Sequence, residues 1–163
     1  DVISVDKNDP VAEDFIINGY KGNDKITGSE NQEKIAGGDG KDTLIGGLGG
    51  DTFIFGAESI ISNLNEDTIS DFKALTKLDK DGSSDRLGFA ADVFRNHEFV
   101  SVKTISDKVS VSGGELKSQG IIYETSSGKI FYDDDGIGTG AAGIVVATLV
   151  GKPTLAADDI VFW

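Results

Sequence analysis

A nine-residue repeat runs without a gap over residues 19–54 and limits what this chain of 163 residues can fold into. Every unit has an acid at its sixth position and a large apolar residue at its eighth. The units are 19–27, 28–36, 37–45 and 46–54; the acids are Asp24, Glu33, Asp42 and Asp51, and the apolar residues are Ile26, Ile35, Leu44 and Phe53. A unit with one large apolar side chain cannot fold alone, so the repeat predicts a stack of units that share one core.

Each unit consists of a glycine-rich turn followed by a short strand. Glycine allows the backbone angles that tight turns require, and the last residues of a unit form a strand that points one side chain inward. We expect two units to complete one turn of a coil, so that residues 18 apart lie above each other at about 4.8 Å. Asp24 then lies over Asp42 on one edge of the coil, and Glu33 lies over Asp51 on the other.

Stacked carboxylates oppose such a coil unless a cation separates them. Two carboxylates about 5 Å apart repel by roughly 3 kcal/mol at an effective dielectric of about 20, and a whole domain is stable by only about 5–15 kcal/mol. Calcium takes about six to eight oxygen ligands, which carboxylates and the carbonyls of glycine-rich turns can supply together. Magnesium fits less well, because it requires octahedral geometry and releases water reluctantly. The repeat therefore predicts several calcium ions between successive turns.

The composition excludes several other classes of protein. Acidic residues outnumber basic residues 28 to 15, and the net charge of −13 disfavours binding to nucleic acid or to an anionic membrane surface. The chain has no cysteine and a single histidine, His97, which excludes disulfides, thiolate zinc sites and an imidazole cluster. No apolar run approaches the roughly 20 residues that span a bilayer, so we expect no membrane insertion.

The repeat resembles a known family. Residues 37–45 and 46–54 match the nonapeptide of RTX proteins, the hemolysin-type repeat that binds calcium. The resemblance implies an all-β fold that begins with a right-handed parallel β-roll. We expect the roll, with an N-terminal cap, over residues 1–55, and a β-sandwich-like segment with one short helix, packed on the roll, over 56–163.

The resemblance also implies a ligand set for each ion. The earlier turn gives the carbonyls of positions two and four and the acid of position six, and the later turn gives the carbonyls of positions one and three and its own acid. One site then uses Tyr20, Gly22, Asp24, Gly37, Asp39 and Asp42, and the opposite site uses Ser29, Asn31, Glu33, Gly46, Leu48 and Asp51. The last two loops can also bind toward the residues after 55, which adds Gly38, Gly40, Gly47 and Gly49.

The segment after the repeat resembles the one that follows the roll in serralysin C-terminal domains and alginate epimerase R-modules. It contains Asp67-Thr68-Ile69-Ser70-Asp71-Phe72 and Ser84-Asp85-Arg86-Leu87-Gly88-Phe89. In that family an aspartate of the first stretch closes the last calcium sites, which implies Asp67 and Asp71 here. Residues 79–85 are either a solvated acidic loop or an additional metal site, although they lack the complete helix-loop-helix calcium pattern.

Hydrophobic periodicity predicts the elements of the C-terminal half. A short helix is expected over 90–96, a hairpin from 121–124 and 129–132, and strands over 142–150 and 159–163.

No pattern in the chain predicts catalysis. Asp133, Asp134 and Asp135 are adjacent acids before a glycine-rich stretch, and we interpret them as a solvated or ion-binding turn rather than a glycosidase pair. His97 has no nucleophile pattern around it and is interpreted as a surface or capping residue. We therefore expect no enzymatic activity from these residues.

The functional hypothesis is a calcium-triggered folding module at the C-terminus of a larger secreted bacterial protein. Asp159 and the four large apolar residues after it resemble the C-terminal export signal of type I secretion substrates, although a final core strand explains them equally. No basic-then-apolar leader precedes the repeat, which fits this route. The expected partners are calcium, the type I secretion machinery and upstream domains of the parent protein, and the expected location is extracellular.

The alternative hypothesis is a polysaccharide-binding module of an extracellular epimerase or adhesin. The resemblance to R-modules motivates it, and Tyr20, Tyr123 and Tyr132 are the side chains available to stack on sugars.

Overall fold

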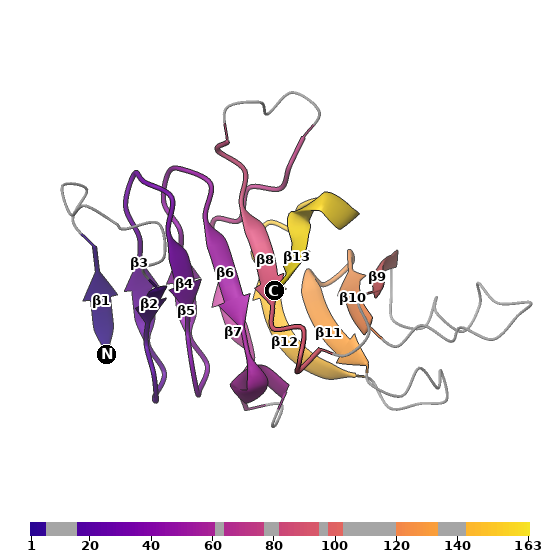
Figure 1. The fold of residues 1–163 in the computed structure, drawn as a ribbon, viewed down its shortest axis with the longest axis horizontal. Helices are drawn as coiled ribbons and strands as arrows, with labels where there is room; N and C mark the ends of the chain where they lie inside the picture. Colours follow the sequence, from indigo (N-terminus) through magenta and orange to yellow (C-terminus); the bar gives the residue numbers. More distant parts are fainter. Residues whose placement is uncertain (6–15, 61–63, 77–81, 95–97, 103–119, 134–142) are drawn as a thin grey trace, which may run out of the picture.

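The computed structural model describes residues 1–5, 16–60, 64–76, 82–94, 98–102, 120–133 and 143–163. These residues form strands, apart from loops and two short 3-10 turns, η1 (Ala57–Ile60) and η2 (Ala157–Asp159). The strands lie in two sheets, and those of the repeat follow one another from one end of the molecule toward the C-terminal hairpin at the other (Figure 1). The expected all-β fold is confirmed.

The strands of the repeat alternate between the two sheets, and all of them pair in parallel. β3 (Lys25–Thr27) pairs with β5 (Thr43–Ile45), and β4 (Lys34–Ala36) pairs with β2 (Ile16–Asn18) on one side and β6 (Thr52–Phe55) on the other. Each strand lies over the strand two units later, so the predicted stacking of residues 18 apart is confirmed.

Both sheets continue beyond the repeat. β7 (Asp67–Ile69) pairs with β5, and β12 (Ile144–Leu149) pairs with β7. On the other side, β8 (Arg86–Phe89) pairs with β6, and β13 (Ile160–Phe162) pairs with β8. All four pairings are parallel, and both sheets cross residue 55, where the division into two domains stays a prediction.

The C-terminal end of the larger sheet changes direction. β12 is antiparallel to β11 (Lys129–Asp133), which forms a hairpin with β10 (Gly120–Glu124), as predicted. β9 (Glu98–Val102) lies parallel beside β10, and β1 (Val2–Ser4) lies parallel beside β3 at the opposite edge. The strand orders are β1-β3-β5-β7-β12-β11-β10-β9 and β13-β8-β6-β4-β2.

The helix expected over 90–96 is a single turn in its described part. The amides of Val93 and Phe94 both donate to the Ala90 carbonyl, at 3.0 and 2.9 Å. His97, residues 79–81 and Asp134 and Asp135 lie outside the described residues.

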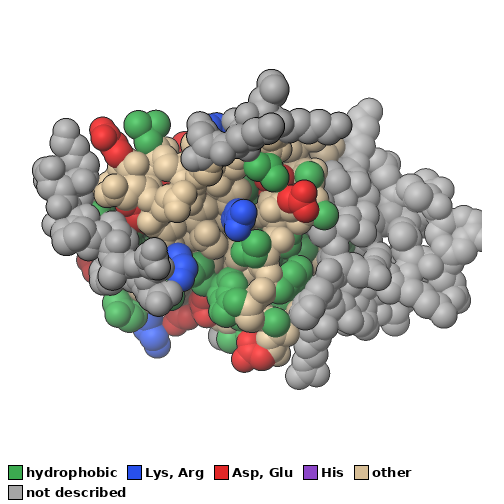
Figure 2. Space-filling view, turned by 45° about the horizontal axis from the view of Figure 1, so that its top comes forward, with side chains coloured by type: hydrophobic (Ala, Val, Ile, Leu, Met, Phe, Trp, Pro, Cys, Tyr) green, Lys and Arg blue, Asp and Glu red, His purple; other side chains and the backbone are tan. Residues whose placement is uncertain are grey.

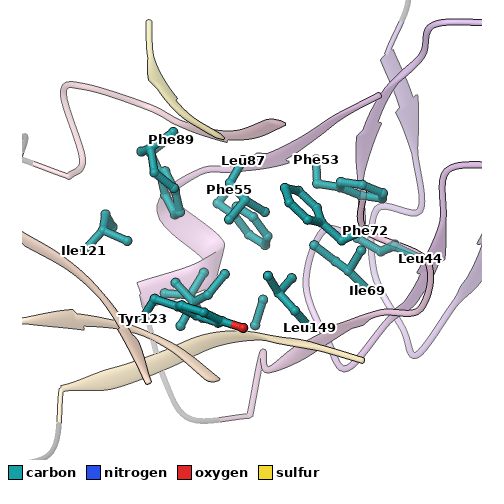
Figure 3. Packing of buried hydrophobic residues seen from close by; sticks show 14 of the residues in the cluster. Leu44, Phe53, Phe55, Ile69, Phe72, Leu87, Phe89, Ile121, Tyr123 and Leu149 are labelled. Carbon is teal, nitrogen blue, oxygen red and sulfur yellow. The ribbon is translucent and has the colours of Figure 1, made fainter. Parts of the chain in front are cut away.

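The inward column of the repeat fills the space between the two sheets. Its four apolar residues, Ile26, Ile35, Leu44 and Phe53, are fully buried. Phe55, Phe89 and Phe94 extend this column, with ring centroids 5.2 and 4.9 Å apart. Figure 3 shows Phe72 beside Leu44 and Ile69, with Phe53 next to it. Burial of each large apolar side chain contributes about 1.5–3 kcal/mol to folding. One unit contributes a single such side chain, so the repeat is stabilised by the sum over the whole column.

The outer surface reflects the composition of the turns. Figure 2 shows a face on which charged side chains are scattered between backbone and small polar groups.

Candidate metal centre

A first column of acids runs along one edge of the roll. The Asp24 amide donates to Asp42 Oδ1 at 2.7 Å, and the Asp42 amide donates to Asp67 Oδ1 at 3.0 Å. The amino group of Asp1 donates to Asp24 Oδ1 at the start of the column. We call Asp24, Asp42 and Asp67 the first ladder; all three side chains are buried.

A second column runs along the opposite edge. The Glu33 amide donates to Asp51 Oδ1 at 2.9 Å, and the Asp51 amide donates to Asp85 Oδ1 at the same distance. We call Glu33, Asp51 and Asp85 the second ladder. Asp85 follows Asp51 by 34 residues instead of 18, because its strand β8 lies beyond the repeat.

Three of these carboxylates are only half satisfied. The Oδ2 atoms of Asp24, Asp42 and Asp51 are buried and have no hydrogen-bond partner. A buried acceptor without a partner costs about 1–3 kcal/mol, and more when it carries charge. These atoms therefore call for a positive charge or a proton between the turns.

The loops of neighbouring turns bring backbone oxygens into the same gap. The Asp39 amide donates to the Tyr20 carbonyl at 2.6 Å, and the Gly22 amide donates to the Asp39 carbonyl at 2.9 Å. A Cβ atom added to Gly38 or Gly40 would lie 2.1 Å from Tyr20 O or 1.9 Å from Gly22 O, and both glycines have positive φ. Only glycine fits there, so the carbonyls of loop 19–24 face loop 37–42 directly.

These features match a known family. Residues 8–161 match the family model described as peptidase M10 serralysin C terminal. The chain belongs to the serralysin C-terminal domain family. This domain is the RTX-repeat, calcium-binding β-roll of the family and its non-catalytic C-terminal part. A comparison with curated proteins found no match.

The serralysin C-terminal domain implies calcium, and the first ladder fits that ion. Its two unpartnered carboxylate oxygens are hard, anionic ligands, and carbonyls of the adjoining loops lie at the same edge. Among the described residues, no three His, Asp or Glu side chains form one cluster. A cation between turns would therefore need backbone carbonyls to complete its coordination.

Four acids of the ladders hold negative charge poorly without a cation. Burial raises the pKa of Asp51 to about 8, and the charges of Asp85 and Glu33 add to the effect. Burial likewise raises the pKa of Asp67 to about 8, with help from Asp42, and that of Asp85 to about 6. Burial also raises the pKa of Asp42. In the metal-free serralysin C-terminal domain, protons therefore compete for these positions.

The other predicted ligands differ in what they contact. Asp71 is exposed and accepts hydrogen bonds from the amides of Gly46 and Gly47, at 3.0 and 2.9 Å, so it holds the fourth loop in place. Gly37 and Gly46 lie against the acids of their own loops: added Cβ atoms would lie 2.2 Å from Asp42 Oδ2 and 2.3 Å from Asp51 Oδ2. A larger residue at either position would displace the carboxylate.

The serralysin C-terminal domain contains one site segment that the repeat did not reveal. Asp85 is 4% exposed, so the solvated-loop interpretation is wrong for this residue. A Cβ atom added to Gly50 would lie 2.1 Å from Gly82 O and 2.8 Å from Ser84 O, and the buried Ser84 hydroxyl has no partner. The signal was present in the sequence: Asp85 precedes the buried Leu87 by two residues, as Asp42 precedes Leu44.

Two of the three tyrosines considered for sugar stacking are inside the core. Tyr123 is fully buried and its hydroxyl donates to the Pro153 carbonyl at 2.7 Å, and Tyr132 is 5% exposed. Their use as sugar-stacking platforms is therefore wrong, and Tyr20 alone remains exposed.

Proposed function

We propose that this domain binds calcium between the turns of its roll and that the bound ions decide whether the roll folds. The observation that carries the proposal is the set of buried, unpartnered Oδ2 atoms on Asp24, Asp42 and Asp51. When bound, calcium supplies positive charge and a preference for oxygen ligands.

The chain's own residues prepare these positions. The Asp24 amide fixes Oδ1 of Asp42, which leaves Asp42 Oδ2 buried and without a partner. The Asp42 amide fixes Oδ1 of Asp67 in the same way. Glycines at positions two and four allow the loops to approach closely enough for their carbonyls to reach the gap. The proposed ligands from the sequence prediction are Tyr20, Gly22, Asp24, Gly37, Asp39 and Asp42 at the first edge, with Asp67 above them, and Ser29, Asn31, Glu33, Gly46, Leu48 and Asp51 at the second. Asp85, which the sequence prediction did not include, is added above Asp51 because the Asp51 amide donates to its Oδ1 at 2.9 Å.

Repulsion between the carboxylates makes folding depend on the calcium concentration, which differs between the cytosol and the extracellular medium. In a cytosol poor in calcium, the carboxylates repel each other or bind protons, and the roll is disfavoured. Extracellular modules bind calcium with dissociation constants of about 10⁻⁴–10⁻³ M, and a tenfold excess of calcium stabilises by about 1.4 kcal/mol per site. We infer that the domain folds after export and stabilises its parent protein outside the cell.

We also infer that a type I secretion system exports the protein, because Asp159 and the four large apolar residues after it resemble the C-terminal signal of its substrates. Asp159 is fully buried and accepts hydrogen bonds from the amides of Leu75 and Ala156, at 2.6 and 2.7 Å. β13 follows it within the five-stranded sheet and pairs with β8, so we expect an exporter to bind this segment before the roll folds. Proteins of the serralysin family are secreted, and among the described residues no helix is long and apolar enough to cross a membrane.

Circular dichroism during a calcium titration tests the proposal. We expect strand signal to appear with calcium and to disappear with a chelator, and Asp42→Ala to raise the calcium concentration needed at least tenfold. Asp92→Ala is the matched control, because Asp92 is an exposed acid outside the proposed ligand set. A chain that is fully folded in chelator, or an unaffected Asp42→Ala variant, would refute the switch.

A further inference from the structure

The second repeat unit differs from the other three in its backbone. Positions two and four have positive φ in the first, third and fourth units; in the first unit these residues are Tyr20 at 68° and Gly22 at 124°. Ser29 and Asn31 occupy the same positions in the second unit, and neither has a positive φ. Loop 28–33 therefore does not repeat the conformation of the loops that surround it.

The acid of this unit is satisfied within its own loop. The Ser29 hydroxyl donates to Glu33 Oε1, and the Ser29 amide donates to Glu33 Oε2 at 3.1 Å. The Asn31 amide donates to the Ser29 hydroxyl oxygen at 3.1 Å, which fixes the hydroxyl from the other side. Both carboxylate oxygens of Glu33 thus have partners, whereas Asp24, one unit earlier, has an unpartnered oxygen.

Side-chain length explains the difference. Glutamate is one methylene longer than aspartate, so its carboxylate reaches back to position two of its own loop. A serine there offers a hydroxyl and an amide, and hydrogen bonds to a charged carboxylate are stronger than those between neutral groups. A glycine at position two, as in the third and fourth units, offers no hydroxyl.

We propose that Ser29 takes the place of a calcium ion in the gap between loops 28–33 and 46–51, which stays metal-free while the gap between loops 19–24 and 37–42 binds calcium. This inference rests on the proposed function and narrows its ligand set, because Ser29, Asn31 and Glu33 then leave it. Asp51 keeps one unpartnered oxygen and remains available to the gap toward Gly82, Ser84 and Asp85.

Counting bound calcium on the whole chain tests the inference. Equilibrium dialysis at saturating calcium, followed by atomic emission spectrometry, compares wild type with Glu33→Gln and Asp42→Asn. Both substitutions keep the shape of the side chain and remove its charge. We expect an unchanged count for Glu33→Gln and a loss of at least one ion for Asp42→Asn. A loss of an ion in Glu33→Gln overturns the inference, and a wild-type protein without calcium overturns the proposed function as well.

A gain-of-site variant keeps the test independent of misfolding. Ser29→Gly combined with Glu33→Asp restores the repeat pattern at positions two and six of the second unit. We expect this double variant to bind one more calcium ion than wild type, because its aspartate has lost the hydroxyl that satisfied Glu33. An unchanged count in a variant that gives the wild-type circular dichroism spectrum with calcium overturns the inference.

Discussion

The two ends of the eight-stranded sheet hold their strands together in different ways. In the roll, β3 and β5 each bury only their central side chain. In the hairpin, β10 and β11 each bury four of their five residues. A strand with one buried side chain depends on its neighbours above and below, so the roll is the weaker end by packing alone.

Charge separates the two ends further. The ladder acids Asp24, Asp42 and Asp51 have a buried oxygen without a partner. At the hairpin end, Glu66 accepts hydrogen bonds from Lys129 Nζ at 3.0 Å and from Thr148 Oγ1 at 2.8 Å. The hairpin end thus supplies a counter-charge for Glu66 from its own residues, whereas the unpartnered Oδ2 atoms of the ladders have none among the described residues. This comparison indicates that calcium dependence is concentrated in the roll.

The largest expected effect follows from removing calcium. Hydrogen exchange, measured by mass spectrometry as calcium is lowered, should show amides of β3–β6 losing protection before those of β10–β12. The reason is that the roll loses its counter-charges while the hairpin keeps its packing and its Glu66–Lys129 pair. Simultaneous loss of protection in both regions would contradict the comparison and indicate one cooperative unit.

A core substitution should come next in size. Phe53 is fully buried in the inward column of the roll, and Phe→Ala changes in cores cost about 3–5 kcal/mol. We expect Phe53→Ala to move the midpoint of calcium-induced folding, followed by circular dichroism, to higher calcium. Ile130→Val in the hairpin is the control, with a cost of about 0.5–1.5 kcal/mol. A larger shift of the calcium midpoint for Ile130→Val than for Phe53→Ala would contradict the comparison, because it would place the calcium-dependent core in the hairpin.

The sequence predicts the regular part of this architecture well, because one period determines it. Ile26 and Leu44 must share a column if two units make a turn, and the same period places Asp24 beside Asp42. Asp85 escaped that reasoning because a long connection separates it from Asp51, so position in the repeat says nothing about it. The signals that remain are the resemblance of residues 84–89 to serralysin C-terminal domains and the local analogy with Asp42 and Leu44.

The sequence did not predict two other features, for a different reason. The parallel pairing of β12 with β7 and of β13 with β8 joins residues far apart in the chain, and such contacts leave no periodic trace. The hydrogen bonds from Ser29 to Glu33 depend on one additional methylene and on the local backbone, which residue types alone do not specify.

The dependence on pH should differ between the two ends. In the metal-free folded state the pKa is raised to about 8 for Asp51 and Asp67 and to about 6 for Asp85. Aspartates of the unfolded state have a pKa of about 3.9. The folded state therefore binds more protons than the unfolded state between these pH values. The stabilisation by these three aspartates is complete below the pKa of the unfolded state and is lost as the pH rises through about 6 to 8.

We therefore expect the melting temperature of calcium-depleted protein to fall between about pH 5 and pH 8, as measured by differential scanning calorimetry. Saturating calcium should remove this fall, because bound calcium favours the charged carboxylates over the protonated ones. Glu66 has the opposite sign: burial opposes its charge, but hydrogen bonds from Lys129 and Thr148 lower its pKa, so its contribution is lost only as the pH falls. A melting temperature that rises with pH in calcium-depleted protein would contradict the assignment of the ladders.

The smallest expected effect compares two neighbouring acids. Glu66 pairs with Lys129 of the hairpin at 3.0 Å and, at the longer distance of 3.9 Å, with Lys41 of the third repeat unit. Asp67 belongs to the first ladder through the Asp42 amide. Because Glu66 and Lys129 are partly exposed, Glu66→Gln should cost at most about 1 kcal/mol, which is roughly 2–4 °C in melting temperature for a domain of this size. Its calcium count should stay at the wild-type value, while Asp67→Asn should bind fewer ions. If Glu66→Gln also binds fewer calcium ions than wild type, then the pair at the hairpin end is coupled to the calcium sites of the roll. That result would contradict the conclusion that calcium dependence is concentrated in the roll.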